Sequence, residues 1–176
     1  MASNFTCPLP SNINPLSSNG FNFSIKKLPA VSFFCQEVNL PGITLQILDF
    51  DTPLSTLPVA SDKLFFDDLV IQFIVDQNME NYKAVYNWMI GLGFDESYQQ
   101  YSDFINTQEG FTRMSRESSD AVLQILGSNN QPVQSIQFID IVPTSLSSMN
   151  FESTVTDVTY IVGTATFKIA RYNFID

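Results

Sequence analysis

The sequence contains no histidine, and this absence removes a large part of enzyme chemistry. Histidine-based catalytic triads, histidine-ligated zinc and histidine general bases are all excluded. The two cysteines, Cys7 and Cys35, are too few and too far apart for a metal knuckle. Cys35 follows Phe33 and Phe34 and is interpreted as a small core filler, because no histidine could activate its thiol. The sequence therefore predicts no cofactor, no metal and no enzymatic activity.

Charged residues are scarce, and basic residues are the scarcest. Only 15% of the 176 residues are charged, against about 25% in a typical globular domain. Eight basic and eighteen acidic residues give a net charge of −10 and a pI near 4.2. The chain as a whole cannot gain affinity for nucleic acid by neutralising phosphates. A surface made largely of Ser, Thr, Asn, Gln and apolar side chains is suited to self-association.

Long apolar runs are also missing. No uninterrupted run approaches the ~20 residues of a membrane-spanning helix, so we expect no membrane partner. The start, MASNFTCPLP, lacks the basic and apolar regions typical of a signal peptide. We therefore expect a mature product that is made in the cytosol without a signal peptide. Sixteen Phe, six Tyr and one Trp predict a folded domain with a sizeable core.

The order of hydrophobic patterns predicts a mainly β fold, a sandwich or barrel of about six to seven strands with one packed α-helix. Residues 1–20, rich in Pro, Ser and Asn, are expected to form an arm, and residues 21–176 a single domain. Residues 49–68 and 94–119 are interpreted as loops. Strands are expected at residues 21–25, 32–38, 43–48, 69–75, 121–126, 135–142 and 158–174.

Residues 81–92 show apolar side chains three and four positions apart, which predicts an amphipathic helix. Trp88 is interpreted as a core anchor in preference to an interface anchor. The side chains expected to anchor this helix are Tyr82, Val85, Trp88 and Met89. The helix start could be capped by Asp76, Asn78 or Asn81.

Acidic side chains gather between residues 49 and 76, where Lys63 is the only basic residue. Asp49 and Asp51 would share one face if this segment is extended. Two interpretations stay open, a divalent-metal or carboxylate-pair site and a solvated negative loop. The second is favoured, because the segment lacks the glycine and the terminal glutamate that known calcium loops place at fixed positions.

Several segments together resemble the tail tube proteins of contractile-tailed bacteriophages, over about residues 21–176. The strand before Leu40-Pro41-Gly42-Ile43 is similar to an early strand of that family, and the helix with Trp88 lies where the family carries its helix. The remaining similar segments are Phe34-Cys35, Phe66-Asp67-Asp68-Leu69, Phe138, Pro143-Thr144-Ser145-Leu146 and Thr166-Phe167.

The resemblance implies a structural protein of the phage tail, part of the virion, whose homo-hexameric rings stack into a hollow tube. The expected partners are the tail sheath protein, baseplate tube proteins and DNA as a transient, non-sticking cargo. Side chains expected in contacts between rings are Ile47, Leu48, Phe50, Leu54, Leu57, Phe65 and Phe66. Acidic side chains expected to face the channel are Asp49, Asp51, Asp62, Asp67 and Asp68.

Three alternatives to a tube subunit stay open at the level of sequence. The first is a baseplate protein of the same fold that initiates the tube. The second is the tube protein of a type VI secretion system. The third, from another class, is a calcium-dependent β-sandwich binding module that would use the acidic segment.

Overall fold

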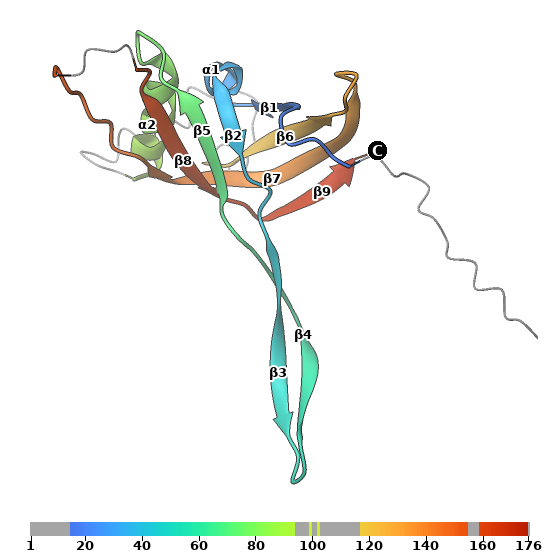
Figure 1. The fold of residues 1–176 in the computed structure, drawn as a ribbon. Helices are drawn as coiled ribbons and strands as arrows, with labels where there is room; N and C mark the ends of the chain where they lie inside the picture. Colours follow the sequence, from blue (N-terminus) through green and yellow to red (C-terminus); the bar gives the residue numbers. More distant parts are fainter. Residues whose placement is uncertain (1–14, 94–98, 100–101, 103–116, 155–158, 176) are drawn as a thin grey trace, which may run out of the picture.

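The computed structural model describes residues 15–93, 99, 102, 117–154 and 159–175 (Figure 1). These residues form nine strands and two helices, which confirms the predicted mainly β fold. The predicted arm lies outside the described residues as far as residue 14, as does most of the segment 94–119. The elements are β1 (Phe21–Ile25), α1 (Pro29–Phe33), β2 (Cys35–Val38), β3 (Ile43–Asp51), β4 (Thr56–Phe66), β5 (Leu69–Ile74), α2 (Glu80–Gly93), β6 (Ser119–Leu126), β7 (Pro132–Leu146), β8 (Val162–Lys168) and β9 (Arg171–Ile175).

Seven of the strands in the described part of the chain form one sheet that bends into two layers. The first layer contains β1, β6, β9 and the amino-terminal half of β7, and the second contains β2, β5, β8 and the carboxy-terminal half of β7. The long strand β7 therefore belongs to both layers. All pairings are antiparallel, which fits the hairpin predicted for β6 and β7.

The bend in β7 lies at Asp140, whose φ of 54° is in the left-handed region. The register beside it skips one residue, because Ser119 pairs with Ile141 while Ala121 pairs with Phe138. Such a bulge bends a strand and lets it pass from one layer to another. The Ser118 hydroxyl donates a hydrogen bond to Asp140 Oδ1 at 2.8 Å and so holds the bulge in place.

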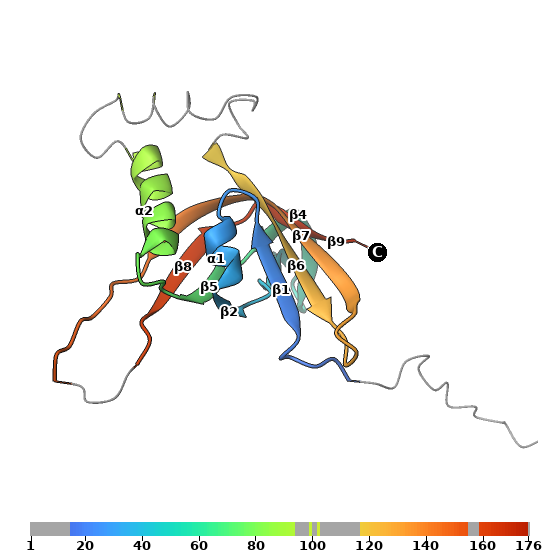
Figure 2. The same cartoon turned by 90° about the horizontal axis from the view of Figure 1, so that it is seen from above.

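The core lies between the two layers and the helices (Figure 2). Side chains alternate along β5, β6 and β8, so every second residue of these strands points inward. Gly163 of β8 lies so close to the Phe73 ring that an added Cβ would come within 3.0 Å of it. The largest fully buried apolar side chains are Phe23, Phe73, Phe138, Phe167, Leu69, Ile71, Ile136, Ile141, Val31 and Val85.

Three sequence predictions of elements are wrong. Residues 32–38 were expected to form one strand, but α1 occupies Pro29–Phe33 and only Cys35–Val38 is extended. A proline is well tolerated in the first turn of a helix, and the turn buries Leu28 and Val31 in the core. The structure therefore has a second, short helix that the periodicity of the sequence does not reveal.

Residues 49–68 were expected to form a loop, but most of them belong to the β3–β4 hairpin. The strand β4 was not predicted because it contains Pro58, which nevertheless pairs with Asp49 of β3. Proline is tolerated on edge strands, and both strands of a two-stranded hairpin are edges. The expected strand at residues 158–174 is divided into β8 and β9, because its partner β7 bends at Asp140. Both halves still pair along β7.

The helix α2 is confirmed and extends one residue beyond the predicted range of 81–92 at each end. Val85 and Trp88 are buried, and Tyr82 and Met89 pack against the core. The Trp88 ring lies 6.1 Å from that of Phe167, and its Nε1 donates a hydrogen bond to the Glu117 carbonyl at 3.1 Å.

Asn81 is fully buried at the start of α2, and its side chain connects the helix to β5. Its Nδ2 donates to the Ile74 carbonyl at 2.7 Å, and its Oδ1 accepts from the Tyr82 backbone N–H at 2.8 Å. The Asp76 Oδ1 accepts from the backbone N–H of Asn81 at 3.3 Å. Of the predicted capping residues, Asp76 and Asn81 therefore act together.

We expect Asn81→Ala to lower the free energy of unfolding by about 1–3 kcal/mol, because it removes a fully buried amide and leaves the half-buried Ile74 carbonyl without its donor. Urea unfolding followed by the fluorescence of Trp88 measures this. Asn87→Ala, on the exposed side of the same helix, is the matched control and should change stability by less than about 0.5 kcal/mol. Equal stabilities of the two variants would contradict the role of Asn81.

The Lys27 ammonium lies 5.2 Å from the centre of the Trp88 ring. Burial lowers the pKa of Lys27 to about 8, and the charge of Glu117 offsets part of this shift. Between this pKa and the ordinary value of 10.5 the unfolded chain binds a proton that the folded chain does not. The buried charge of Lys27 therefore destabilises the folded chain below pH 8, and the free energy of unfolding rises as the pH increases from about 8 to 10.5.

We expect Lys27→Met to be most stabilising, relative to the wild type, below pH 8, and to lose this advantage as the pH approaches 10.5. The measurement is the free energy of urea unfolding of both proteins at several pH values. Stability curves that run parallel across this range would contradict the lowered pKa of Lys27.

Candidate functional site

The β3–β4 hairpin projects away from the body of the protein as a long arm (Figure 1). Its strands pair with each other and with no other strand in the described residues. With eleven residues in β4, the arm is about 36 Å long at ~3.3 Å per residue. Its tip closes through a hydrogen bond from the Thr52 backbone N–H to the Ser55 carbonyl at 3.0 Å. A two-stranded hairpin is marginally stable alone, so the arm needs further contacts.

Apolar side chains cover this hairpin, although nothing in the described protomer covers them. Leu54 at the tip is 99% exposed and Phe50 is 65% exposed. Contiguous exposed apolar surface of this kind marks a site of protein–protein contact. The exposed apolar side chains of the hairpin are Ile43, Leu45, Ile47, Leu48, Phe50, Leu54, Leu57, Val59, Leu64 and Phe65.

The outer half of the hairpin has two chemically different faces. Leu48 pairs with Val59 and Phe50 with Leu57, so these four apolar side chains share one face. Asp49 and Asp51 alternate with them and therefore lie on the other face, as their spacing predicts. The Thr56 hydroxyl donates a hydrogen bond to Asp51 Oδ1 at 3.1 Å. The outer hairpin is thus amphipathic, with one apolar face available for contact.

The root of the hairpin is fixed to the body by aromatic packing. Phe66 meets Tyr172 of β9 edge to face at 5.5 Å between ring centres, and Tyr172 meets Phe138 of β7 at 6.0 Å. The Asp67 backbone N–H donates to the Gly42 carbonyl at 3.0 Å. A Cβ on Gly42 would lie 2.6 Å from the end of the Asp67 side chain, so this carboxylate would have to shift to admit a larger residue. The arm is held at its root and has no support beyond it in the described protomer.

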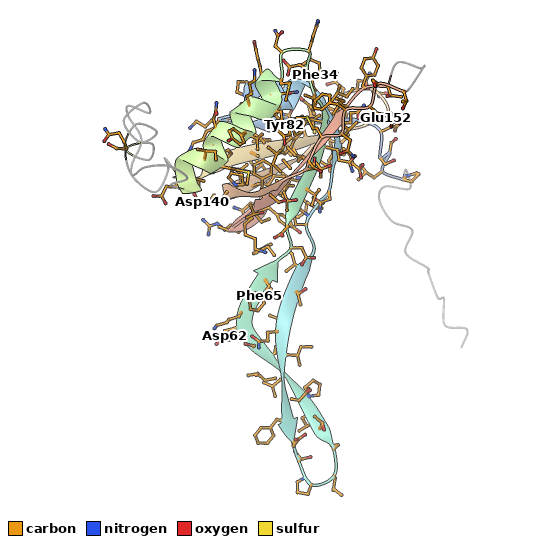
Figure 3. The ribbon with its side chains drawn as sticks, turned by 90° about the vertical axis from the view of Figure 1, so that its left-hand side faces the viewer. Phe34, Asp62, Phe65, Tyr82, Asp140 and Glu152 are labelled. Carbon is orange, nitrogen blue, oxygen red and sulfur yellow. The ribbon has the colours of Figure 1, made fainter. Side chains whose placement is uncertain are left out.

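The five acidic residues predicted for a channel are spread along this region. Asp49 and Asp51 lie on the outer hairpin, and Asp62 lies in an irregular part of β4 (Figure 3). Asp67 lies at the root, and Asp68 forms an ion pair with Lys168 of β8 at 2.5 Å. In the part of the chain that the structure describes, no three acidic or thiol side chains gather where they could hold a metal ion. Their role in a channel stays a prediction.

Of the seven residues predicted to make contacts between rings, six are exposed on the hairpin and Phe66 is half-buried at its root. The prediction omitted Ile43, Leu45, Val59 and Leu64, which are equally exposed. An alternating pattern through residues 56–66 could have revealed Val59 and Leu64, but Pro58 and the irregular residues 61–63 interrupt it. Ile43 and Leu45 lie in the strand predicted at residues 43–48, whereas the predicted contacts began only at Ile47.

Sequence reasoning also missed two open strand edges in the first layer. β1 pairs only with β6, and β9 pairs only with β7, among the described strands. Phe174 of β9 is 60% exposed. Unpaired strand edges are templates for pairing with another chain, so these edges are a second candidate interface.

The sulfur of Cys35 donates a weak hydrogen bond to the Glu37 carbonyl at 3.6 Å. Burial raises the pKa of Cys35 to about 11, so the thiol stays protonated at neutral pH. This fits its interpretation as a core filler, because the thiolate is the reactive form. None of the helices in the described residues is long and apolar enough to span a membrane.

Comparisons with known proteins agree with this architecture. Residues 1–175 match the sequence model of the phage tail tube protein family. No curated protein sequence matches the chain. The chain is similar in structure to the tube-terminating cap of the anti-feeding prophage, with a TM-score of 0.61 and 12% identity over 98% of this chain and 99% of that chain.

Two further solved structures share the fold. The 6-fold symmetrised baseplate of the anti-feeding prophage contains a chain with a TM-score of 0.58 and 14% identity over 92% of this chain and 96% of that chain. The sheath-tube complex of an extracellular contractile injection system contains a chain with a TM-score of 0.57 and 17% identity over 92% of this chain and 91% of that chain. Because the family match extends over nearly the whole sequence, this chain belongs to the phage tail tube proteins, a family of structural proteins and not of enzymes.

Proposed function

We propose that this chain is the subunit of the inner tube of a contractile tail, in which six copies form a ring and the rings stack into a hollow tube that delivers DNA. The observation that carries the proposal is the projecting hairpin, whose apolar side chains have no cover in the described protomer. A neighbouring ring would bury them. Each Å² of apolar surface removed from water contributes about 25 cal/mol before the costs of association.

The geometry of the hairpin favours stacking over a closed dimer. The hairpin lies on one side of the protomer, and the body that would receive it is a different surface (Figure 1). A contact between two different surfaces is head-to-tail, and it generates a filament when its rotation does not close. Contacts between hairpins and the next ring therefore propagate along a tube axis.

The open edges of the first layer provide a means of closing the ring. This layer has four antiparallel strands, so β1 and β9 at its two ends run in opposite directions. The β9 edge of one copy can therefore pair antiparallel with the β1 edge of the next, and both strands have five residues. A ring closed in this way leaves neither edge of the first layer exposed.

The helical side of the protomer is the surface that we assign to the sheath. The helix α2 is anchored by Val85 and Trp88, and it lies on the body away from the hairpin (Figure 3). The baseplate tube proteins would provide the first ring on which this chain assembles. The tube would form in the host cytoplasm and become part of the virion.

A second candidate function is a ring at one end of the tube. The similar structures include a tube-terminating cap and a baseplate component. A tube subunit polymerises into long tubes, whereas an initiator or terminator forms single rings. The two functions therefore predict different particles.

Negative-stain electron microscopy of the purified protein over a range of concentrations tests the proposal. We expect rings and long hollow tubes, and we expect Phe50→Asp to raise the concentration needed for tubes at least about tenfold, since a carboxylate would enter an apolar contact. Asn87→Asp, on the exposed side of α2, is the control with the same gain in charge and should assemble normally.

Single rings without tubes would support the end-ring function. Tubes formed by Phe50→Asp at the wild-type concentration would contradict the role of the hairpin. Circular dichroism of both variants shows whether the body stays folded, as expected for a substitution outside the core.

A further inference from the structure

The outer face of the first layer, the side away from the core, is polar and carries few charges. Its residues alternate with the buried Phe23, Leu123, Ile136 and Phe138. Strand pairing arranges them in two rows across the layer. The first row is Asn22, Gln124, Ser135 and Ile175, and the second is Ser24, Val122, Gln137 and Asn173.

Charged residues lie only at one end of this face, among the described residues. Arg171 pairs with Ile139 at the start of β9, and Asp120 lies at the bulge of β6. Lys26 follows β1, and its backbone N–H donates to the Asp120 carbonyl at 3.1 Å. The two rows between that end and the β6–β7 turn contain neither acid nor base, although the chain has a net charge of −10. All five acids predicted for a channel lie elsewhere, within residues 49–68.

The outer face of the second layer has a different character. There Val70, Ile74 and Val162 point away from the core, beside Gln72, Thr164 and Thr166. Glu37 and Lys168 add charge to the same face. A surface that mixes apolar, polar and charged side chains is suited to contact with protein. The amide and hydroxyl groups of the first layer are instead suited to contact with water, because each can donate to it and accept from it.

The mass of the protomer lies on the core side of the first layer. Both helices and the second layer cover that side, and the outer face is bare in the described structure (Figure 2). A ring closed through β1 and β9 has more room outside than inside. The bulky side of each protomer therefore faces outward, and the bare face turns toward the axis.

We propose that the channel wall formed by the outer face of the first layer is hydrated and uncharged along its two rows, which expose amide and hydroxyl groups beside the apolar Val122 and Ile175. This inference rests on the proposed tube function and replaces the expectation of an acidic channel. The two rows of the wall have no cation that could hold phosphate. They also have no anions to repel it, so DNA passes because nothing along these rows binds it.

A cysteine placed at Gln137 tests where this face lies. The parent protein carries Cys7→Ser and Cys35→Ala, and Asn87→Cys on α2 is the matched control. In assembled tubes, Gln137→Cys should react with small methanethiosulfonates but not with a maleimide on a long polyethylene glycol chain, which is excluded from a narrow bore. Both reagents should modify it in unassembled protein, and both should modify Asn87→Cys in either state.

The charge of the wall is measured with cationic and anionic methanethiosulfonates of equal size. We expect the ratio of their rates at Gln137→Cys to agree within about twofold between tubes and unassembled protein, because an uncharged wall has little surface potential. A cationic preference of about tenfold or more in tubes would establish an acidic channel and overturn the inference.

Modification of Gln137→Cys by the bulky maleimide in tubes would also overturn it, while the tube function would stand. If the cysteine-free parent forms no rings or tubes under conditions in which its body is folded, the proposed function itself is contradicted, and this inference fails with it.

Discussion

A hairpin of two strands cannot bury both of its own faces, and the architecture of this protein depends on that constraint. The outer β3–β4 hairpin places four apolar side chains on one face, where the described protomer offers no cover. Burial of such a face is the main source of stability for a sheet. We therefore expect another copy or another protein to cover this face and to stabilise the hairpin.

Packing at the root of the hairpin fixes its direction relative to the body. The bend of β7 at Asp140 folds one sheet into two layers, and Phe138 of the same strand supports Tyr172, on which Phe66 at the hairpin root packs. A shift of the bend would therefore move the root. Rigid anchoring lowers the entropy that is lost when the hairpin docks. Fold and assembly are thus connected through one strand.

Sequence patterns predicted the elements whose stability comes from the protomer itself. The central strand β5, the helix α2 and the β6–β7 hairpin have regular periods, because each buries one face in the core. The β3–β4 hairpin was interpreted as a loop, since Pro58 and an irregular register interrupt its alternation. The open edges of β1 and β9 could not be predicted from the sequence. Whether a strand lies at an edge depends on which strands pair in the folded sheet, and the pattern within one strand does not show this. The family resemblance suggested the proposed tube function, and the exposed hairpin side chains give that proposal its physical reason.

The most direct test of this account is amide hydrogen exchange of residues 43–66 in the assembled and the unassembled protein. The hairpin amides should exchange readily in the unassembled state, because a two-stranded hairpin opens often. We expect their exchange to slow at least about tenfold in tubes, while the amides of the core strands change little. Unchanged hairpin exchange in well-formed tubes would contradict the claim that assembly completes this part of the structure.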